Sequence, residues 1–190
     1  MSTTTRWTSK DLESLPDDGT RYEIVDGELF MSKTPHYYHQ DVCFELLLLL
    51  GNWNRTASLG RVVVAPGMIF AEDNDVVPDL IWISRERLIE SLESDGHLHR
   101  APELVIEVLS PGRANERRDR EAKLNLYSRR GVGEYWIVSW QARTIDVYRR
   151  KDAQLQLEKT LSESDTLVSQ MLPGLACQVS YVFAGIPSPK

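Results

Sequence analysis

Two carboxylates interrupt apolar runs that have the composition of buried β-strands. Glu107 stands in the middle of Leu104–Leu109, and Asp79 stands inside Val76–Ile83. Near-continuous aliphatic runs are typical of strands that are covered on both faces. An ionised carboxylate in such a place costs roughly several kcal/mol unless a cation or hydrogen bonds compensate for it. The chain must therefore fold so that something positive reaches both side chains.

The size and composition of the chain indicate a globular protein. It has 190 residues, of which 42% are hydrophobic and 26% charged, and we expect one domain over residues 1–190. The first residues lack the apolar core of a signal peptide, and the longest apolar block, Leu46–Leu50, is too short to span a bilayer. Cys43 and Cys177 have no spacing typical of a disulfide framework or a zinc site, and Cys43 is interpreted as a buried thiol. We expect a soluble, cytoplasmic protein.

The order of the expected elements favours an α/β fold with a mixed sheet. Asp26-Gly27 between two alternating runs predicts a tight hairpin, and apolar spacing predicts a helix from 36 to 54 that is buried around most of its circumference. Val76–Ile83 is expected to be one strand that carries Asp79. A helix over 113–130 separates the Glu107 strand from the strand predicted at 134–138, which indicates a crossover connection.

If the strands that carry Asp79 and Glu107 lie side by side, both carboxylates can converge on one Mg²⁺-type ion. The backbone carbonyl of Val108 is a further candidate ligand. Lys123 shares a helical stripe with Asp119 and Tyr127, and its ammonium could orient a water or stabilise charge on a phosphate if that stripe faces the sheet. Each carboxylate could instead be a structural acid paired with an arginine, and the Lys123 stripe could be an ordinary helix ion pair.

The net charge of −6 argues against indiscriminate binding of nucleic acid, but the charge is unevenly spread. Between Pro111 and Arg130 there are seven basic and three acidic residues. This segment could meet phosphates, or it could be a solvated helix face laced with ion pairs. The residues that we expect to contact a nucleic-acid backbone are Arg113, Arg117, Arg118 and Arg120.

These residues resemble the active-site set of the PD-(D/E)XK nuclease superfamily in a permuted form. In the usual pattern a lysine stands two residues after the second acid, where this chain has Leu109, so the lysine role would move to Lys123. More closely, the chain is similar to the Uma-two family of restriction-endonuclease-like proteins over about residues 20–183. The matching stretches are Tyr22–Leu29, Val77–Leu80, Glu107–Pro111, Asp119 with Lys123, Tyr127, and Gly131–Val138.

The resemblance implies a restriction-endonuclease-like αβββαβ core at about 20–150, with extra N-terminal strands and a C-terminal β extension at about 151–183. It also implies Mg²⁺- or Mn²⁺-dependent hydrolysis of DNA by a metal-activated water, no organic cofactor, and a homodimer. Within that pattern Glu23 could complete the carboxylate cluster, or be an exposed hairpin residue. His39 could touch a phosphate or a metal-bound water, or be an ordinary hydrogen-bonded histidine.

The leading hypothesis from the sequence is therefore a metal-dependent endodeoxyribonuclease, with Asp79, Glu107 and Lys123 as its catalytic residues. The main alternative is a nucleic-acid-binding or structural domain that keeps the same fold without turnover. A third interpretation is metal-free acid–base hydrolysis of another substrate, with Glu107 as the proton donor. It leaves the basic helix unexplained.

Overall fold

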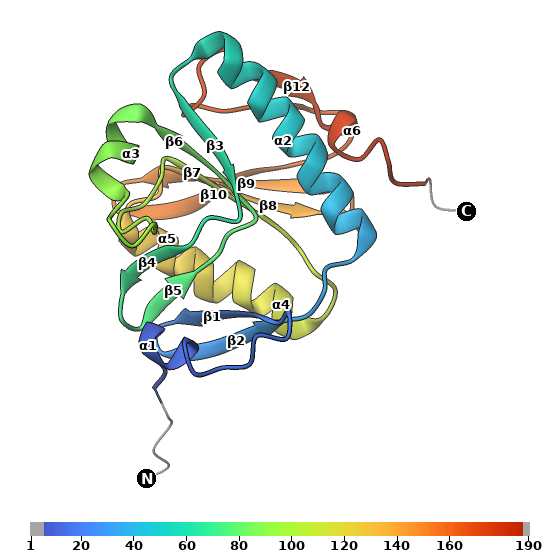
Figure 1. The fold of residues 1–190 in the computed structure, drawn as a ribbon. Coiled ribbons are helices and arrows are strands. Elements are labelled where there is room, and N and C mark those ends of the chain that lie inside the picture. Colours follow the sequence, from blue (N-terminus) through green and yellow to red (C-terminus); the bar gives the residue numbers. More distant parts are fainter. Residues whose placement is uncertain (1–5, 188–190) are drawn as a thin grey trace.

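A six-stranded mixed sheet forms the centre of the computed structural model, which describes residues 6–187 (Figure 1). Across the sheet the strands are β10 (Gln154–Leu161), β9 (Thr144–Lys151), β8 (Glu134–Ser139), β7 (Leu104–Val108), β6 (Leu80–Ser84) and β3 (Gly60–Val64). Strands β7 and β8 are parallel, and every other neighbouring pair in this sheet is antiparallel. The parallel pair confirms the crossover connection expected from the sequence.

A smaller antiparallel sheet lies beside the central one. Its order is β2 (Glu28–Ser32), β1 (Arg21–Val25), β5 (Asn74–Val76) and β4 (Met68–Ala71). The β1–β2 hairpin is the one predicted from Asp26-Gly27, since both turn residues have positive φ angles of 52° and 78°. Near the C-terminus, β11 (Thr166–Val168) pairs with β12 (Ala176–Gln178).

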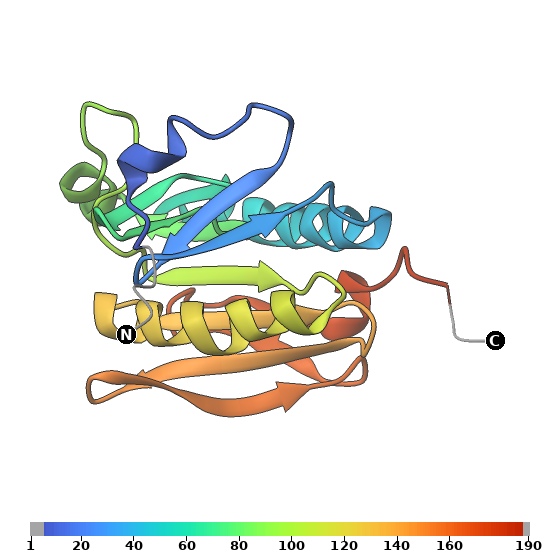
Figure 2. The same cartoon turned by 90° about the horizontal axis from the view of Figure 1, so that it is seen from below.

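Two helical segments provide most of the cover over the central sheet. On one side is the long helix α2 (Tyr37–Ala57), and on the other a continuous segment of α4 (Arg113–Arg117), a π-helical stretch η1 (Arg118–Lys123) and α5 (Leu124–Arg130). Figure 1 shows the latter, in yellow, with the blue β1–β2 hairpin below it, and Figure 2 shows the hairpin above the helix in the view from below. The shorter helices are α1 (Ser9–Leu12), α3 (Arg85–Ser91) and α6 (Val179–Val182).

The expected fold class is confirmed. The elements α2, β3, β6, β7, α4–α5 and β8 give the αβββαβ order, with the β4–β5 hairpin inserted between β3 and β6 and helix α3 between β6 and β7. Alternate residues of β7 enter two separate cores, because successive side chains of a strand point to opposite faces. Ile106 joins the core under α2, and Val105 joins the core under α5. Glu107 follows Val105 at the period of two, so it faces α5.

The sequence prediction for the Asp79 strand is wrong. The apolar run 76–83 is divided between two sheets, because β5 ends at Val76 and β6 begins at Leu80. Pro78 lies in the break and has no backbone N–H to donate to a sheet ladder. Asp79 therefore stands at the entrance of β6 and not inside a strand, whereas Glu107 lies within fully buried β7 as expected.

The prediction that α2 is buried around most of its circumference is also wrong. Its fully buried residues are His39, Val42, Leu46 and Leu50, which form one stripe. Phe44 and Leu48 are 54% and 42% exposed on the opposite side, and they share a stripe with exposed Tyr37. The helix thus has a second apolar face that the described part of the chain leaves open to solvent.

Candidate active site

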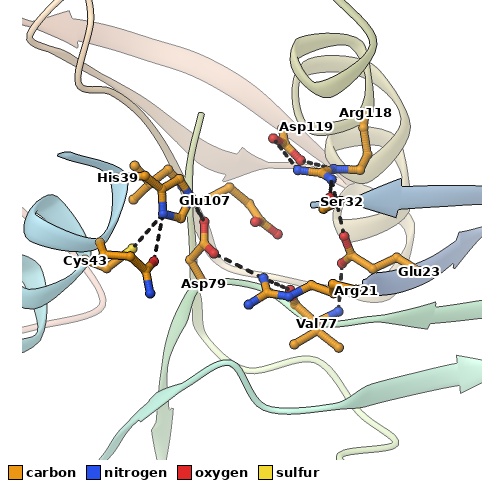
Figure 3. A network of polar contacts seen from close by, with 12 residues as sticks. Arg21, Glu23, Ser32, His39, Cys43, Val77, Asp79, Glu107, Arg118 and Asp119 are labelled. Carbon is orange, nitrogen blue, oxygen red and sulfur yellow. Dashed lines mark hydrogen bonds and ion pairs between the residues drawn. The ribbon is translucent and has the colours of Figure 1, made fainter. Parts of the chain in front are cut away.

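Asp79 and Glu107 meet at the junction of β6 and β7. Leu80 pairs with Ile106 in the antiparallel register, so the next position along the two strands places Asp79 opposite Glu107. The Asp79 Oδ2 atom accepts a 2.8 Å hydrogen bond from the backbone N–H of Val108. Both carboxylates are buried, and Figure 3 shows them in one polar network. The structure thus brings together the two acids that the sequence singled out.

Glu107 is held by the helical segment that follows its own strand. Its Oε1 atom lies 2.8 Å from Lys123 Nζ and accepts a 3.0 Å hydrogen bond from the Tyr127 hydroxyl. Lys123 and Tyr127 are one turn apart, and both side chains are completely buried against the sheet. The stripe formed by Asp119, Lys123 and Tyr127 therefore faces the sheet, as the catalytic interpretation of Lys123 requires.

Glu23 completes the surroundings of Lys123 from the opposite side. Its Oε1 atom lies 2.7 Å from Lys123 Nζ and also accepts a 2.8 Å hydrogen bond from the Val77 N–H. Arg118 Nη1 lies 3.6 Å from Glu23 Oε2, and Arg118 Nε is 2.8 Å from Asp119 Oδ1. Glu23 is thus a buried member of the cluster and not an exposed hairpin residue.

Asp79 has a different set of neighbours, on its side toward α2. His39 Nε2 lies 3.3 Å from Asp79 Oδ2, and Arg21 Nη1 lies 3.3 Å from Asp79 Oδ1. Cys43 Sγ is 3.7 Å from His39 Nδ1, on the next turn of α2. Figure 3 shows this connected series from Cys43 through His39 and Asp79 to Arg21.

Sequence reasoning missed Arg21 and Cys43 as neighbours of the site. The signal for Cys43 was its position four residues after His39, which places both on one face of a helix. Arg21 stands two residues before Glu23 in β1, so the two side chains share one face of that strand. Neither spacing is informative until the partner residue is known to belong to a site.

The site holds more buried negative than buried positive charge. Four acids are buried, Glu23, Asp79, Glu107 and Asp119, and they surround three buried bases, Arg118, Lys123 and His39, of which His39 is charged only when it is protonated. Arg21 is a further cation at the rim, with a half-exposed side chain. An excess of buried carboxylate of this kind is costly unless another cation neutralises it.

The pKa values of the two central acids diverge for this reason. Burial raises the pKa of Glu107 to about 8, against the opposing effect of Lys123, and the charges of Asp119, Asp79 and Glu23 add to the rise. Burial also acts to raise the pKa of Asp79, but the His39 hydrogen bond and charge, the Val108 N–H and Lys123 outweigh it and lower that pKa to about 2. Burial opposes the charge of Lys123, yet Glu107 and Glu23 raise the pKa of its ammonium above the ordinary value.

These donors fit a divalent metal ion. Carboxylate oxygens suit Mg²⁺ and Mn²⁺, and the excess of buried negative charge is what such an ion would neutralise. One ligand atom from each of His39, Cys43 and Asp79 also lies within 4.8 Å of the others. The imidazole and sulfur ligands of this second set suit transition metals better than Mg²⁺.

A cleft leads from the surface to Asp79. Its inner part, of about 120 Å³, is lined by Asp79, His39, Arg21, Lys33 and Arg118, among others. Its outer part, of about 280 Å³, shares Ser32, Lys33, Pro35 and Ser110 with the inner part. Glu107 lines neither part and is 2% exposed. Asp79 and His39 therefore face the cleft, with Glu107 behind them.

The four arginines expected to contact a nucleic-acid backbone fall into two groups. Arg113 is exposed at the start of α4, and exposed Arg117 pairs with Glu121 at 3.5 Å. Arg118 is buried within the carboxylate cluster, and Arg120 pairs with Asp146 at 2.6 Å. The first two are therefore available to solvent, whereas the last two already have acidic partners inside the protein.

The sheet order, the crossover helix and the two opposed acids define a restriction-endonuclease-like α/β protein. A family model described as "Uma2: Putative restriction endonuclease" matches residues 9–180. The chain belongs to this family, which is the Uma-two family indicated by its sequence motifs. A nuclease is the class of function that this membership supports.

A solved structure shows the same fold. The chain is similar to a "putative nuclease belonging to DUF820" from Anabaena variabilis, with 18% identity, a TM-score of 0.72, and coverage of 93% of this chain and 97% of that one. A weaker similarity, with a TM-score of 0.43 and 12% identity, links 77% of this chain to 15% of the type IIG restriction endonuclease BpuSI. No curated protein matches the sequence. Within residues 6–187, every helix is too short or too polar to cross a bilayer.

Proposed function

We propose that this protein is a metal-dependent endonuclease that hydrolyses phosphodiester bonds in DNA. The observation that carries the proposal is the group of four buried carboxylates around three buried bases, Arg118, Lys123 and His39, at the end of a cationic cleft. Membership of a family described as restriction endonucleases supports the reaction class. A buried excess of carboxylate has no evident structural benefit, because apolar side chains would fill the same space at lower cost.

In this proposal Asp79, Glu107 and the backbone carbonyl of Val108 hold the metal ion, which is Mg²⁺ or Mn²⁺. A bound divalent ion supplies Lewis-acid polarisation of the phosphate and a lowered pKa for water. Asp79 is the acid that faces the cleft, and its hydrogen bond from Val108 fixes its position relative to β7. Tyr127 fixes the Glu107 carboxylate from the other side.

Lys123 would assist hydrolysis by orienting the attacking water or by stabilising negative charge on the phosphate. Glu23 and Glu107 keep its ammonium charged and hold it in place from two sides. Glu23 is thus a positioning residue. His39 Nε2 lies beside Asp79 in the wall of the cleft, where it can hold or move a proton.

The phosphate backbone would be held by cations along and beside the cleft. Lys33 and Arg21 line the inner cavity, and Arg113 and Arg117 are exposed on α4. Arg118 pairs with Asp119 and Arg120 pairs with Asp146, so these two arginines would act on the phosphate backbone only indirectly, by holding those acids in place. Contacts of this kind position a nucleic acid without reading its sequence.

The homodimer, the cytoplasmic location, and the single domain of residues 1–190 with its core and C-terminal extension remain predictions. For the dimer, the stripe of Tyr37, Phe44 and Leu48 on α2 offers an exposed apolar surface. Phe44→Glu should then reduce the mass measured by light scattering from that of a dimer to that of a monomer. An unchanged mass would exclude this face.

Cleavage of plasmid DNA by purified protein tests the nuclease proposal. Wild type is compared with the variants Asp79→Asn, Glu107→Gln and Lys123→Met. Each protein is assayed with Mg²⁺, with Mn²⁺ and with a chelator. Glu134→Gln is the matched control, since Glu134 is equally buried, on β8, with Trp136 and Ser169 as partners. We expect metal-dependent cleavage by wild type and the control, and at least about a 100-fold loss in the three site variants.

Two other outcomes identify the alternatives. If wild type and all variants show the same trace of cleavage, the activity belongs to a contaminant, and a binding or structural domain becomes the better interpretation. Activity that resists the chelator and is lost in Glu107→Gln would instead indicate acid–base chemistry without a metal. The raised pKa of Glu107 suits it to that role.

A further inference from the structure

Four aromatic rings gather where α2 begins and β8 ends. The rings of His36 and Trp140 are stacked, with centroids 4.7 Å apart and an interplanar angle of 16°. Tyr38 lies 5.6 Å from Trp140 and 5.4 Å from His36, and Tyr37 lies 5.5 Å from Tyr38. None of these rings has a role in the hydrolysis proposed above.

This aromatic cluster borders the cleft. His36 lines the outer part of the cleft, of about 280 Å³, which joins the inner cavity that contains Asp79. His36 is the N-cap of α2, and His39, which lies 3.3 Å from Asp79, is in the first turn of that helix, so the start of α2 contributes one residue to the cluster and one to the acid site. A nucleic-acid strand with a phosphate beside Asp79 would therefore bring a neighbouring base to the rings.

The rings are more exposed than a structural cluster requires. His36 and Tyr37 are exposed, and Tyr38 and Trp140 are only half-buried. Trp140 packs one side against the core under α2. Its buried indole N–H has no acceptor in the part of the chain that the structure describes. No hydrogen bond of the indole N–H therefore fixes the position of this ring.

The cations around the cleft suit the phosphate group of a nucleotide, as the rings suit its base. Lys33 lines both parts of the cleft, and Arg21 and Arg118 line the inner part, so phosphates would meet cations where bases meet rings. This combination is typical of sites for single strands, because every unpaired base offers a face for stacking. In a duplex the bases stack on one another, and their faces cannot reach a protein ring.

We propose that His36, Tyr38 and Trp140 form a base-stacking platform for an unpaired nucleotide next to the scissile phosphate, so that the substrate is single-stranded DNA or a duplex with an unpaired strand. The position of the scissile phosphate rests on the proposed function, whereas the stacking of a base does not. The cluster would thereby make the cleft select unpaired over paired nucleotides, without reading the sequence of the bases.

Binding of three labelled oligonucleotides, measured by fluorescence anisotropy in a chelator to prevent cleavage, tests the proposal. They are a single strand, its duplex, and an oligomer of equal length in which every nucleotide is abasic. Stacking of one base on an aromatic ring contributes about 5- to 150-fold in affinity. We therefore expect wild type to bind the normal single strand at least about 5-fold more tightly than the abasic one. The single strand should also be bound more tightly than the duplex.

Tyr38→Ala and Trp140→Ala should reduce the ratio of normal to abasic affinity toward one, while binding of the abasic oligomer stays unchanged. Trp140→Phe keeps a ring and should retain most of the ratio. Tyr181→Ala, which removes a 66% exposed tyrosine outside the cluster, should leave the ratio intact. Melting temperatures confirm that each variant is folded.

Equal affinity of wild type for normal and abasic strands would overturn the proposal. Tight binding of the duplex at the expense of the single strand, or variants with the wild-type ratio, would also overturn it. These results are independent of cleavage. Cleavage with no base preference would refute the platform alone, whereas a base preference without cleavage of either plasmid or single-stranded circular DNA would refute the nuclease and keep the platform.

Discussion

The Asp79 carboxylate accepts a 2.8 Å hydrogen bond from the backbone N–H of Val108, the residue that follows Glu107. This bond ties the entrance of β6 to the end of β7 at the point where the two acids lie opposite each other. The Asp79 side chain thus supplies an acceptor for Val108 just beyond Leu80–Ile106, the last pair of the β6–β7 ladder. The β6–β7 register places the two carboxylates opposite each other, and this bond fixes the orientation of one of them.

Lys123→Met should destabilise the protein by about 3–5 kcal/mol, because it leaves Glu23 and Glu107 buried without their shared cation. Urea denaturation in a chelator at pH 9, where Glu107 with its pKa of about 8 is ionised, measures the change. In a Glu107→Gln background the same substitution should cost clearly less, since one of the two carboxylates is already neutral. Equal costs in both backgrounds would show that the Lys123–Glu107 pair is not coupled.

Stability without metal should fall as the pH rises from about 4.5 to about 8. The pKa of Glu107 is raised from its ordinary value of 4.5 to about 8, so in this window the folded protein keeps a proton that the unfolded chain releases. The contribution of Glu107 is complete below this window and is lost across it, by up to about 1.4 kcal/mol per pH unit. Urea denaturation in a chelator at several pH values gives the slope.

Glu107→Gln should make the slope of unfolding free energy against pH shallower. The difference in slope between wild type and Glu107→Gln is the contribution of Glu107. The raised pKa of His39 acts in the same direction in both proteins. The lowered pKa of Asp79, about 2, affects stability only in more acidic solution, where stability is lost as the pH falls from 3.8. Parallel curves for wild type and Glu107→Gln would contradict the assignment.

Metal preference should depend on Cys43 and His39. If both bind the ion that Asp79 binds, Co²⁺ and Zn²⁺ should raise the melting temperature more than Mg²⁺ does, because sulfur and imidazole ligands favour these metals. Cys43→Ser should reduce the shifts with Co²⁺ and Zn²⁺ and leave the Mg²⁺ shift unchanged. Cys177→Ser, at the other cysteine, is the control and should change none of them. Equal loss in both cysteine variants would point to nonspecific thiol binding.

Salt dependence should separate the exposed from the paired arginines. Arg113→Ala should weaken DNA binding and lower the slope of log affinity against log salt by about one unit for each phosphate that the variant no longer neutralises. Arg120→Ala should change that slope little, because Arg120 already pairs with Asp146, and should act mainly on stability. Binding measured at several salt concentrations tests both statements, and the reverse order would show that Arg120 is the residue that meets phosphate.

The sequence was sufficient for the fold because its strongest signals are local. Asp26-Gly27 fixes the β1–β2 hairpin, and the apolar run of β7 with the helix over 113–130 fixes the crossover. The division of 76–83 between two sheets was harder to foresee, since apolar residues continue on both sides of Pro78. The open face of α2 was missed for a related reason. A run of leucines does not reveal which of them find a partner.

For the site, the sequence identified the two unusual acids and named Lys123, Glu23 and His39 as candidates beside them, but it did not give their contacts and missed Arg21 and Cys43. Burial of Glu107 and Asp79 followed from their apolar neighbours in the chain. The contacts of Arg21 with Asp79 and of Glu23 with Lys123 join residues that are 58 and 100 positions apart. Contacts at such separations depend on how the two sheets pack, and no local pattern encodes them.

The π-helical stretch at Arg118–Lys123 carries one further consequence. Its wider turn lets the adjacent residues Arg118 and Asp119 both point toward the sheet. Deleting one residue there would restore an ordinary α-helix and rotate everything on its N-terminal side by about 100° relative to Lys123. Loss of a single codon could thus abolish the activity of such a protein while leaving its fold intact. Relatives that have and relatives that lack this extra residue need not share an activity.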